Sequence, residues 1–289
     1  MAVPPRRPYG LLLWRLLRTP LIALLALLLM LSLLERILVF PAPPRNSSDW
    51  VAADLPHEDV YFEGDGGVRL HGWYVPHPTP RGVALYCHGN GEHVAHLASR
   101  LKILHQLRLN VFAWDYRSYG KSEGKPHEDN VIADALRAYR WLADRADVDP
   151  SEVILIGSSL GGAVAVQLAG EHPIRGLVIE RSFAELTEAA AYHFPWLPVR
   201  WLMRNEFRSV DHIAKYRGPL LQVHGTADEI VPYEMGVRLF EAAATDNKRF
   251  ITVEGGSHNE PLPESYYLQL DAFLQALEPA AELLPESPP

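Results

Sequence analysis

A glycine- and serine-rich turn between an apolar strand and a small-residue helix constrains this chain more than any other feature. Residues 153–156 are apolar and rich in β-branched side chains, residues 157–161 read Gly-Ser-Ser-Leu-Gly, and residues 163–169 suit a buried helix. Strand, Gly-x-Ser-x-Gly turn and helix in this order predict a nucleophile elbow with Ser159 at its tip. Gly157 and Gly161 leave room beside a strained serine, and the N–H of Leu160 would face a developing oxyanion. The alternative interpretation is a Gly/Ser loop between two buried elements.

Two further residues follow later in the chain, in the order that a catalytic triad on such an elbow requires. Asp228 is the first carboxylate after the apolar strand 218–225, and His258 lies in a Gly-rich turn after the strand 249–253. We expect His258 to act as general base toward the Ser159 hydroxyl, and Asp228 to hold the imidazole tautomer. A lone Asp or His in a loop is usually a solvated residue. Three such residues in this order, each after its own strand, predict a triad.

The loop after the apolar strand 82–87 reads His-Gly-Asn-Gly and is the candidate for a second oxyanion donor. Its glycines let the backbone approach a substrate closely, so the N–H of Asn90 is the predicted donor. We expect His88 to brace the loop by hydrogen bonds rather than to bind a metal. The thirteen histidines are scattered without metal-ligand spacing, and neither a metal nor a cofactor is expected.

Five short motifs together resemble a known family. They occupy residues 88–91, 115–124, 157–161, 224–228 and 257–259. In this order they resemble the α/β-hydrolase superfamily, and within it the Bem46-like, ABHD12/13/17-like branch of serine hydrolases. The resemblance covers roughly residues 55–278 and implies hydrolysis of esters, thioesters or lipids without choosing among them. Arg181 stands where small or apolar residues are commoner in the family, and it is expected to alter the pocket.

Alternating apolar strands and helical stretches favour one catalytic domain over residues 46–278. Its expected fold is the α/β-hydrolase fold, with a mostly parallel central sheet flanked by helices and a short lid over about residues 183–217. Residues 68–75 are expected to form an edge strand paired with 58–62, and Asp129 or Asn130 is expected to cap a helix over 130–145. The Pro- and Glu-containing residues 279–289 are predicted to be disordered.

The N-terminal segment, residues 1–45, is the other strong signal. It carries six Arg and one Glu, and an apolar stretch of about 22 residues runs from 19 to 40. Because such a helix is long enough for a bilayer, we expect an uncleaved transmembrane signal anchor. Its basic N-terminus would be cytoplasmic, with the catalytic domain on the extracytoplasmic side. A cleaved signal peptide and a helix on the membrane surface are the alternatives, and the segment is expected to supply attachment rather than chemistry.

The charge distribution limits the partners that the chain can have. The net charge is −8 overall and +5 over residues 1–45, which leaves −13 for the remainder. An acidic domain of this kind fits neither nucleic acid nor anionic lipid headgroups, and no obligate protein partner is inferred. We therefore expect a membrane-anchored serine hydrolase that forms an acyl-enzyme on Ser159 from a small-molecule ester, thioester or lipid. The alternatives are a serine peptidase or amidase with the same triad, and a non-catalytic binding protein of the same fold.

Overall fold

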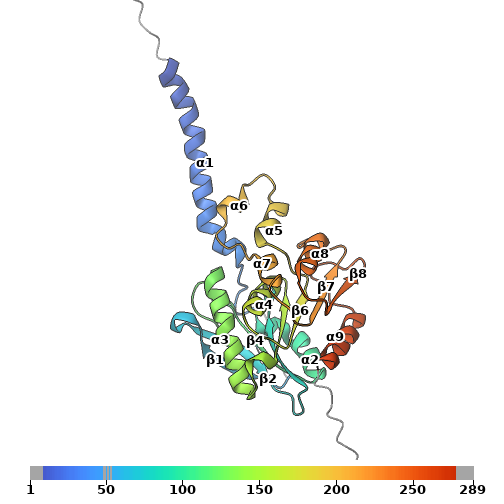
Figure 1. Ribbon diagram of the computed structural model, residues 1–289. Coiled ribbons are helices and arrows are strands. Elements are labelled where there is room, and N and C mark those ends of the chain that lie inside the picture. Colours follow the sequence, from blue (N-terminus) through green and yellow to red (C-terminus); the bar gives the residue numbers. More distant parts are fainter. Residues whose placement is uncertain (1–8, 48–49, 51, 53, 278–289) are drawn as a thin grey trace, which may run out of the picture.

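The computed structural model describes residues 9–47, 50, 52 and 54–277, and the predicted tail 279–289 lies outside them. Within the described residues, one sheet contains eight strands in the order β1-β2-β4-β3-β5-β6-β7-β8 (Figure 1). β1 pairs antiparallel with β2 and β2 antiparallel with β4, whereas the described pairs from β4 to β8 are parallel. The strands are β1 (Glu58–Glu63), β2 (Arg69–Val75), β3 (Gly82–Cys87), β4 (Leu109–Trp114), β5 (Val153–Ser158), β6 (Gly176–Glu180), β7 (Leu220–Gly225) and β8 (Lys248–Val253).

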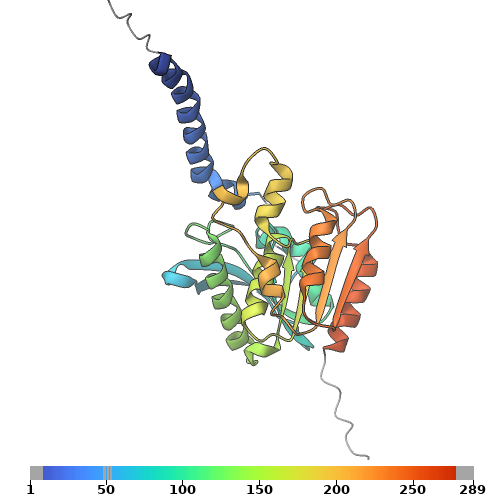
Figure 2. The same cartoon turned by 45° about the horizontal axis from the view of Figure 1, so that its top comes forward.

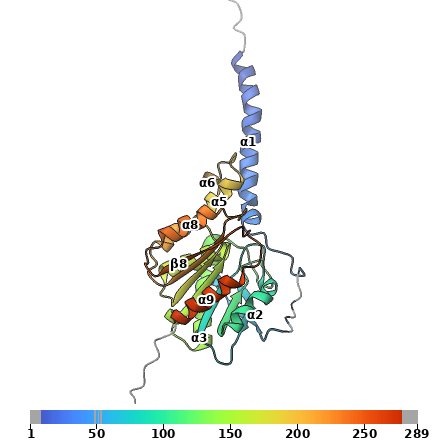
Figure 3. The same cartoon turned by 90° about the vertical axis from the view of Figure 1, so that its right-hand side faces the viewer.

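Helices cover both faces of this sheet. The α-helices are α1 (Tyr9–Val39), α2 (Ala98–Gln106), α3 (Glu128–Ala146), α4 (Leu160–Glu171), α5 (Leu186–His193), α6 (Val199–Leu202), α7 (Ser209–Ile213), α8 (Tyr233–Ala242) and α9 (Glu264–Ala276), and short 3-10 helices occupy Asp65–Gly67, Val94–Leu97 and Pro150–Glu152. Side chains of α3, α4 and α8 pack in one core cluster, and those of α2 and α9 pack in the other. Figure 3 shows α2 and α9 on the side of the sheet that faces the viewer.

The central strands are apolar along their whole length because both of their faces are covered. In β3, Leu85 belongs to the core cluster under α3 and α4, and its neighbours Ala84 and Tyr86 belong to the cluster under α2 and α9. Successive side chains of a strand point to opposite faces, so a two-sided sheet requires continuous apolar runs. The predicted α/β architecture, mostly parallel and flanked by helices, is confirmed.

Two local expectations about the N-terminal half of the α/β domain are wrong. β2 is not an edge strand, because it pairs with β1 on one side and with β4 on the other. The helix α3 begins earlier than expected, and its N-cap residue is His127. Asn130 lies one turn inside, where its Oδ1 accepts a hydrogen bond from the His127 N–H at 2.9 Å. Asn130 is thus the third residue of the helix and accepts the N–H of His127, whereas the N-cap position is occupied by His127 itself.

The helix α1 projects away from the α/β domain, and only its last turns reach it (Figures 1 and 2). Among the helices that the structure describes, none combines the length and the hydropathy that a membrane crossing requires. The predicted transmembrane span over about residues 19–40 is therefore not supported. The end of that stretch is packed against protein instead, since Glu35, Val39 and Phe40 are buried.

Candidate active site

A strand, a tight turn with Ser159 at its tip and a helix follow one another where β5 meets α4, in the order expected of a nucleophile elbow. Ser159 has φ 51° and ψ −116°, a conformation that non-glycine residues rarely adopt. A Cβ atom at Gly157 would lie 2.2 Å from the Gly161 carbonyl oxygen, and one at Gly161 would lie 2.0 Å from the Cys87 carbonyl oxygen. Neither position can hold a side chain, because the turn is packed against its own helix and against the end of β3. The Ser159 N–H donates to the Glu180 carbonyl oxygen at 2.8 Å, which ties the strained residue to β6.

Three residues from separate loops meet at this elbow. The Ser159 Oγ lies 3.1 Å from His258 Nε2, and His258 Nδ1 lies 2.7 Å from Asp228 Oδ2. Asp228 follows β7 and His258 follows β8, and parallel strands bring their carboxyl ends to the same edge of the sheet. The structure therefore places all three predicted triad residues in one hydrogen-bonded chain.

Asp228 is oriented by more partners than His258 alone. Its Oδ1 accepts the backbone N–H groups of Ile230 and Val231 at 3.0 and 2.8 Å, and its Oδ2 lies 3.2 Å from His224 Nε2. Burial by itself would raise the pKa of Asp228, but hydrogen bonds from His224 and His258 outweigh it and hold that pKa well below its usual range. The carboxylate therefore stays ionised at neutral pH. The sequence-based prediction did not include the contact between His224 and Asp228, although His224 lies only four residues before Asp228.

The two predicted oxyanion donors lie beside Ser159. Leu160 is the first residue of α4, where backbone N–H groups have no partner inside the helix. In the loop after β3, the Gly89 N–H donates to Glu92 Oε2 at 3.0 Å, which leaves the next N–H, that of Asn90, as the candidate donor. Asn90 and Leu160 both line the cavity at the serine. His88 Nδ1 bonds the Gly89 carbonyl oxygen at 2.7 Å, so this buried histidine braces the loop.

Arg181 is not among the described residues that line the cavity at Ser159, so, contrary to the sequence-based expectation, it does not alter the pocket as a lining residue. It follows β6 and has φ 51°. Its guanidinium donates to the carbonyl oxygens of His258 and Glu260 at 2.5 and 2.6 Å. Because two donors of one rigid group hold carbonyls two residues apart, Arg181 restrains the position of the His258 backbone.

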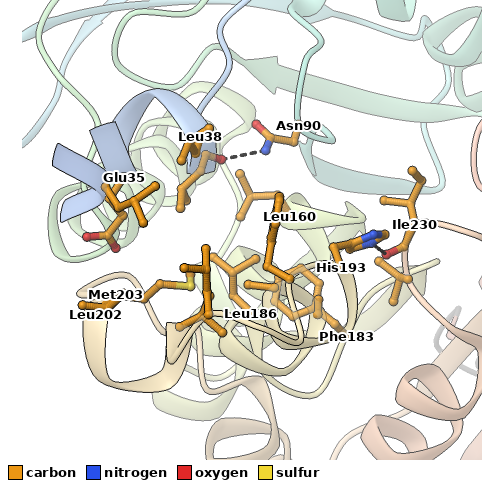
Figure 4. Close-up of a pocket in the computed structure, with 18 of the residues that line it drawn as sticks. Glu35, Leu38, Asn90, Leu160, Phe183, Leu186, His193, Leu202, Met203 and Ile230 are labelled. Carbon is orange, nitrogen blue, oxygen red and sulfur yellow. Dashed lines mark hydrogen bonds between the residues drawn. The ribbon is translucent and has the colours of Figure 1, made fainter. Parts of the chain in front are cut away.

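An apolar cavity of about 450 Å³ opens above the candidate triad. Figure 4 shows the side chains that line it, which come from the lid, from the loops around Ser159 and from the end of α1. Glu35 is the only Asp, Glu, Lys or Arg among the described residues that line it. The lid residues in the lining are Phe183, Leu186, Ala189, Ala190, His193, Phe194, Trp196, Leu197, Val199, Leu202 and Met203. The predicted contact of the lid with the pocket is thus present, but the wall formed by α1 was not foreseen.

Comparison with known proteins agrees with this fold. The family described as "Serine aminopeptidase, S33" matches residues 78–210. The protein Rv2307c of Mycobacterium tuberculosis is 38% identical over 253 residues, which is 86% of this chain and 89% of that one. The alpha/beta hydrolase domain-containing protein WAV2 of Arabidopsis thaliana is 30% identical, with 80% of this chain and 82% of that one covered. The structure of the Pyrococcus furiosus esterase Pf2001 superposes with a TM-score of 0.68 at 22% identity, over 81% of this chain and 98% of that one. The chain therefore belongs to the α/β-hydrolase superfamily, in its ABHD-like branch.

Proposed function

We propose that the protein is a serine hydrolase that cleaves carboxylic esters or thioesters with apolar acyl groups. One observation carries this proposal: the hydrogen-bonded chain of Ser159, His258 and Asp228 ends at the floor of an apolar cavity. The nucleophile thus faces a space that accepts a hydrocarbon group and offers little to a charged one.

The geometry supports the following reaction sequence. His258 Nε2 takes the proton of Ser159 as its Oγ attacks the acyl carbon. The oxyanion that forms accepts hydrogen bonds from the N–H groups of Leu160 and Asn90. When the intermediate collapses, His258 returns the proton to the leaving oxygen or sulfur, and the acyl group stays on Ser159. A water molecule, deprotonated by His258, then attacks the acyl carbon, and His258 returns that proton to Ser159 Oγ as the acyl–oxygen bond breaks and the carboxylic acid leaves.

Hydrolysis of peptides is the second candidate, because the matched family is described as a serine aminopeptidase. Recognition of a free amino terminus needs an unpaired carboxylate near the nucleophile. Among the described residues that line the cavity, Glu35 supplies the carboxylate. Its Oε1 already accepts three hydrogen bonds from Arg204 and Asn205, so this oxygen is not unpaired. The cavity therefore favours an acyl group over an aminoacyl group.

A substrate series tests this choice. We expect kcat/KM for p-nitrophenyl esters to rise from acetate toward longer acyl chains, by roughly fourfold per methylene that the cavity buries, since each contributes about 0.8 kcal/mol. An aminoacyl p-nitroanilide should be a much poorer substrate. Leu186→Trp should fill part of the cavity and move the preference to shorter chains, whereas Leu268→Trp on the exposed face of α9 should not. An unchanged profile for Leu186→Trp would show that acyl chains bind elsewhere.

Arg181→Met should lower kcat by about 10- to 100-fold, because a catalytic base displaced by about 1 Å loses that much. The matched control is Arg175→Met, since Arg175 holds the Leu277 carbonyl oxygen in the same way, at 3.0 and 2.6 Å, away from the triad. Both variants should melt at similar temperatures, and only Arg181→Met should lose turnover. Equal losses in the two variants would assign Arg181 a role in stability alone.

Attachment to a membrane, with the catalytic domain on its extracytoplasmic side, stays a prediction from the sequence. What favours contact with lipid is the exposure of apolar side chains along α1, Leu24, Leu25 and Leu29 among them. Sedimentation with liposomes and protease digestion of intact cells would test the contact and the side.

A further inference from the structure

The end of α1 is hydrogen-bonded to the loop after β3, which carries the proposed oxyanion donor Asn90. The Val39 carbonyl oxygen accepts a hydrogen bond from Asn90 Nδ2 at 2.6 Å (Figure 4). A carbonyl can only accept, so the orientation of the Asn90 amide is determined by this contact. The other end of the amide, Oδ1, accepts from the Tyr119 hydroxyl. The side chain of Asn90 is therefore held between α1 and the loop after β4.

One turn earlier on α1, the buried carboxylate of Glu35 accepts hydrogen bonds from lid residues 204 and 205. Glu35 is 7% exposed, and its Oε1 accepts from the backbone N–H groups of Arg204 and Asn205 at 2.7 and 2.9 Å. The Asn205 side chain donates to the same oxygen at 2.9 Å. A buried charge is tolerated where it is hydrogen-bonded in this way, and removing it leaves the buried donors unpaired.

These two contacts lie one helical turn apart at the C-terminal end of α1, since Glu35 and Val39 are four residues apart. Between them, Leu38 lines the cavity opposite the lid residues Leu202 and Met203 (Figure 4). The position of α1, which Glu35 fixes, therefore determines both where Leu38 lines the cavity and whether the Val39 carbonyl oxygen reaches Asn90.

We propose that α1 is a part of the catalytic site and that Glu35 is the positioning residue that seats it. With α1 in place, Val39 holds Asn90 so that its backbone N–H faces the oxyanion, and Leu38 closes the side of the cavity. The inference rests on the proposed hydrolysis at Ser159, and it departs from the expectation that the N-terminal segment supplies attachment alone.

The test uses the full-length chain with Glu35→Leu, which removes the acceptor at similar volume. We expect kcat on p-nitrophenyl acetate to fall by about 10- to 100-fold, because displacing an oxyanion donor weakens transition-state binding. On a long-chain ester KM should rise as well, because the wall at Leu38 moves. Glu35→Gln keeps an acceptor oxygen and should recover much of the lost kcat. If Glu35→Leu does not fold, as judged by its thermal melt, Glu35→Gln carries the test with an expected severalfold loss of kcat.

The matched control is Glu128→Leu. Glu128 also accepts two backbone N–H groups from the end of the lid, those of Glu206 and Phe207 at 2.6 and 3.0 Å, but it belongs to α3. Its loss removes the contacts of Glu206 and Phe207 but leaves those of Glu35 with Arg204 and Asn205, so α1 should stay in place and kcat on the acetate should stay within about twofold. Unchanged kcat in folded Glu35 variants, or an equal loss in Glu128→Leu, would overturn the inference. The proposed function fails by a different result, namely hydrolysis that persists in Ser159→Ala.

Discussion

Ser159→Ala is expected to abolish ester hydrolysis and labelling by a fluorophosphonate, with a loss of about 10⁴- to 10⁶-fold in kcat. The Oγ of Ser159 is the atom bonded to His258 Nε2 at 3.1 Å, and alanine leaves the histidine without a nucleophile to activate. The fold should persist, because the elbow is held by backbone contacts of Ser159, such as its N–H to the Glu180 carbonyl oxygen. Steady-state kinetics and mass-spectrometric mapping of the labelled serine measure both effects.

Ser158→Ala is the matched control for this experiment. Ser158 is the last residue of β5, and its neighbour, not Ser158, is bonded to His258. The control should keep most of the activity and all of the labelling. Label found on Ser158, or loss of activity in that variant alone, would contradict the assignment of the nucleophile.

Asp228→Asn is expected to lower kcat by about 10³- to 10⁴-fold, because it reverses the tautomer of His258. The N–H groups of Ile230 and Val231 can only donate, so the single oxygen of an asparagine amide would face them. Its NH₂ group would then point at His258 Nδ1, and His258 Nε2 would carry the proton. A protonated Nε2 cannot accept the Ser159 proton. Steady-state kinetics of the purified variant measure the loss.

Glu229→Gln is the control for the acid, since Glu229 is the neighbouring carboxylate and its Oε2 lies 3.5 Å from the His258 N–H. We expect this variant to keep near-normal turnover. Near-normal turnover in Asp228→Asn together with a loss in Glu229→Gln would identify Glu229 as the acid of the triad.

Much of the candidate site could be predicted because it depends on local backbone and on a regular topology. The elbow needs a strand, a turn without side chains at two positions and a helix, and all three are adjacent in the chain. Asp228 and His258 could then be found as the polar residues that follow later parallel strands. The capping residue of α3 could not be predicted as well, because His127, Asp129 and Asn130 are all polar and their hydrogen bonds depend on small differences in where the helix begins.

The contacts of the residues that support the site could not be predicted from the sequence. Arg181 contacts a carbonyl 77 positions away, and Glu35 contacts an amide 170 positions away. No local pattern encodes such pairs, because any carbonyl or amide of the chain offers the same chemistry. From the sequence, Arg181 was therefore expected to alter the pocket. Its contacts with the carbonyl oxygens of His258 and Glu260 are seen only in the tertiary structure.

The N-terminal helix shows most directly where the information in the sequence ends. The apolar composition of residues 19–40 indicated a long helix whose side chains favour an apolar environment over water. Hydropathy does not distinguish a lipid tail from a protein core, because the two are equally apolar. Only the tertiary structure decided that the end of this helix, at Glu35 and Val39, meets the lid and the loop that carries Asn90.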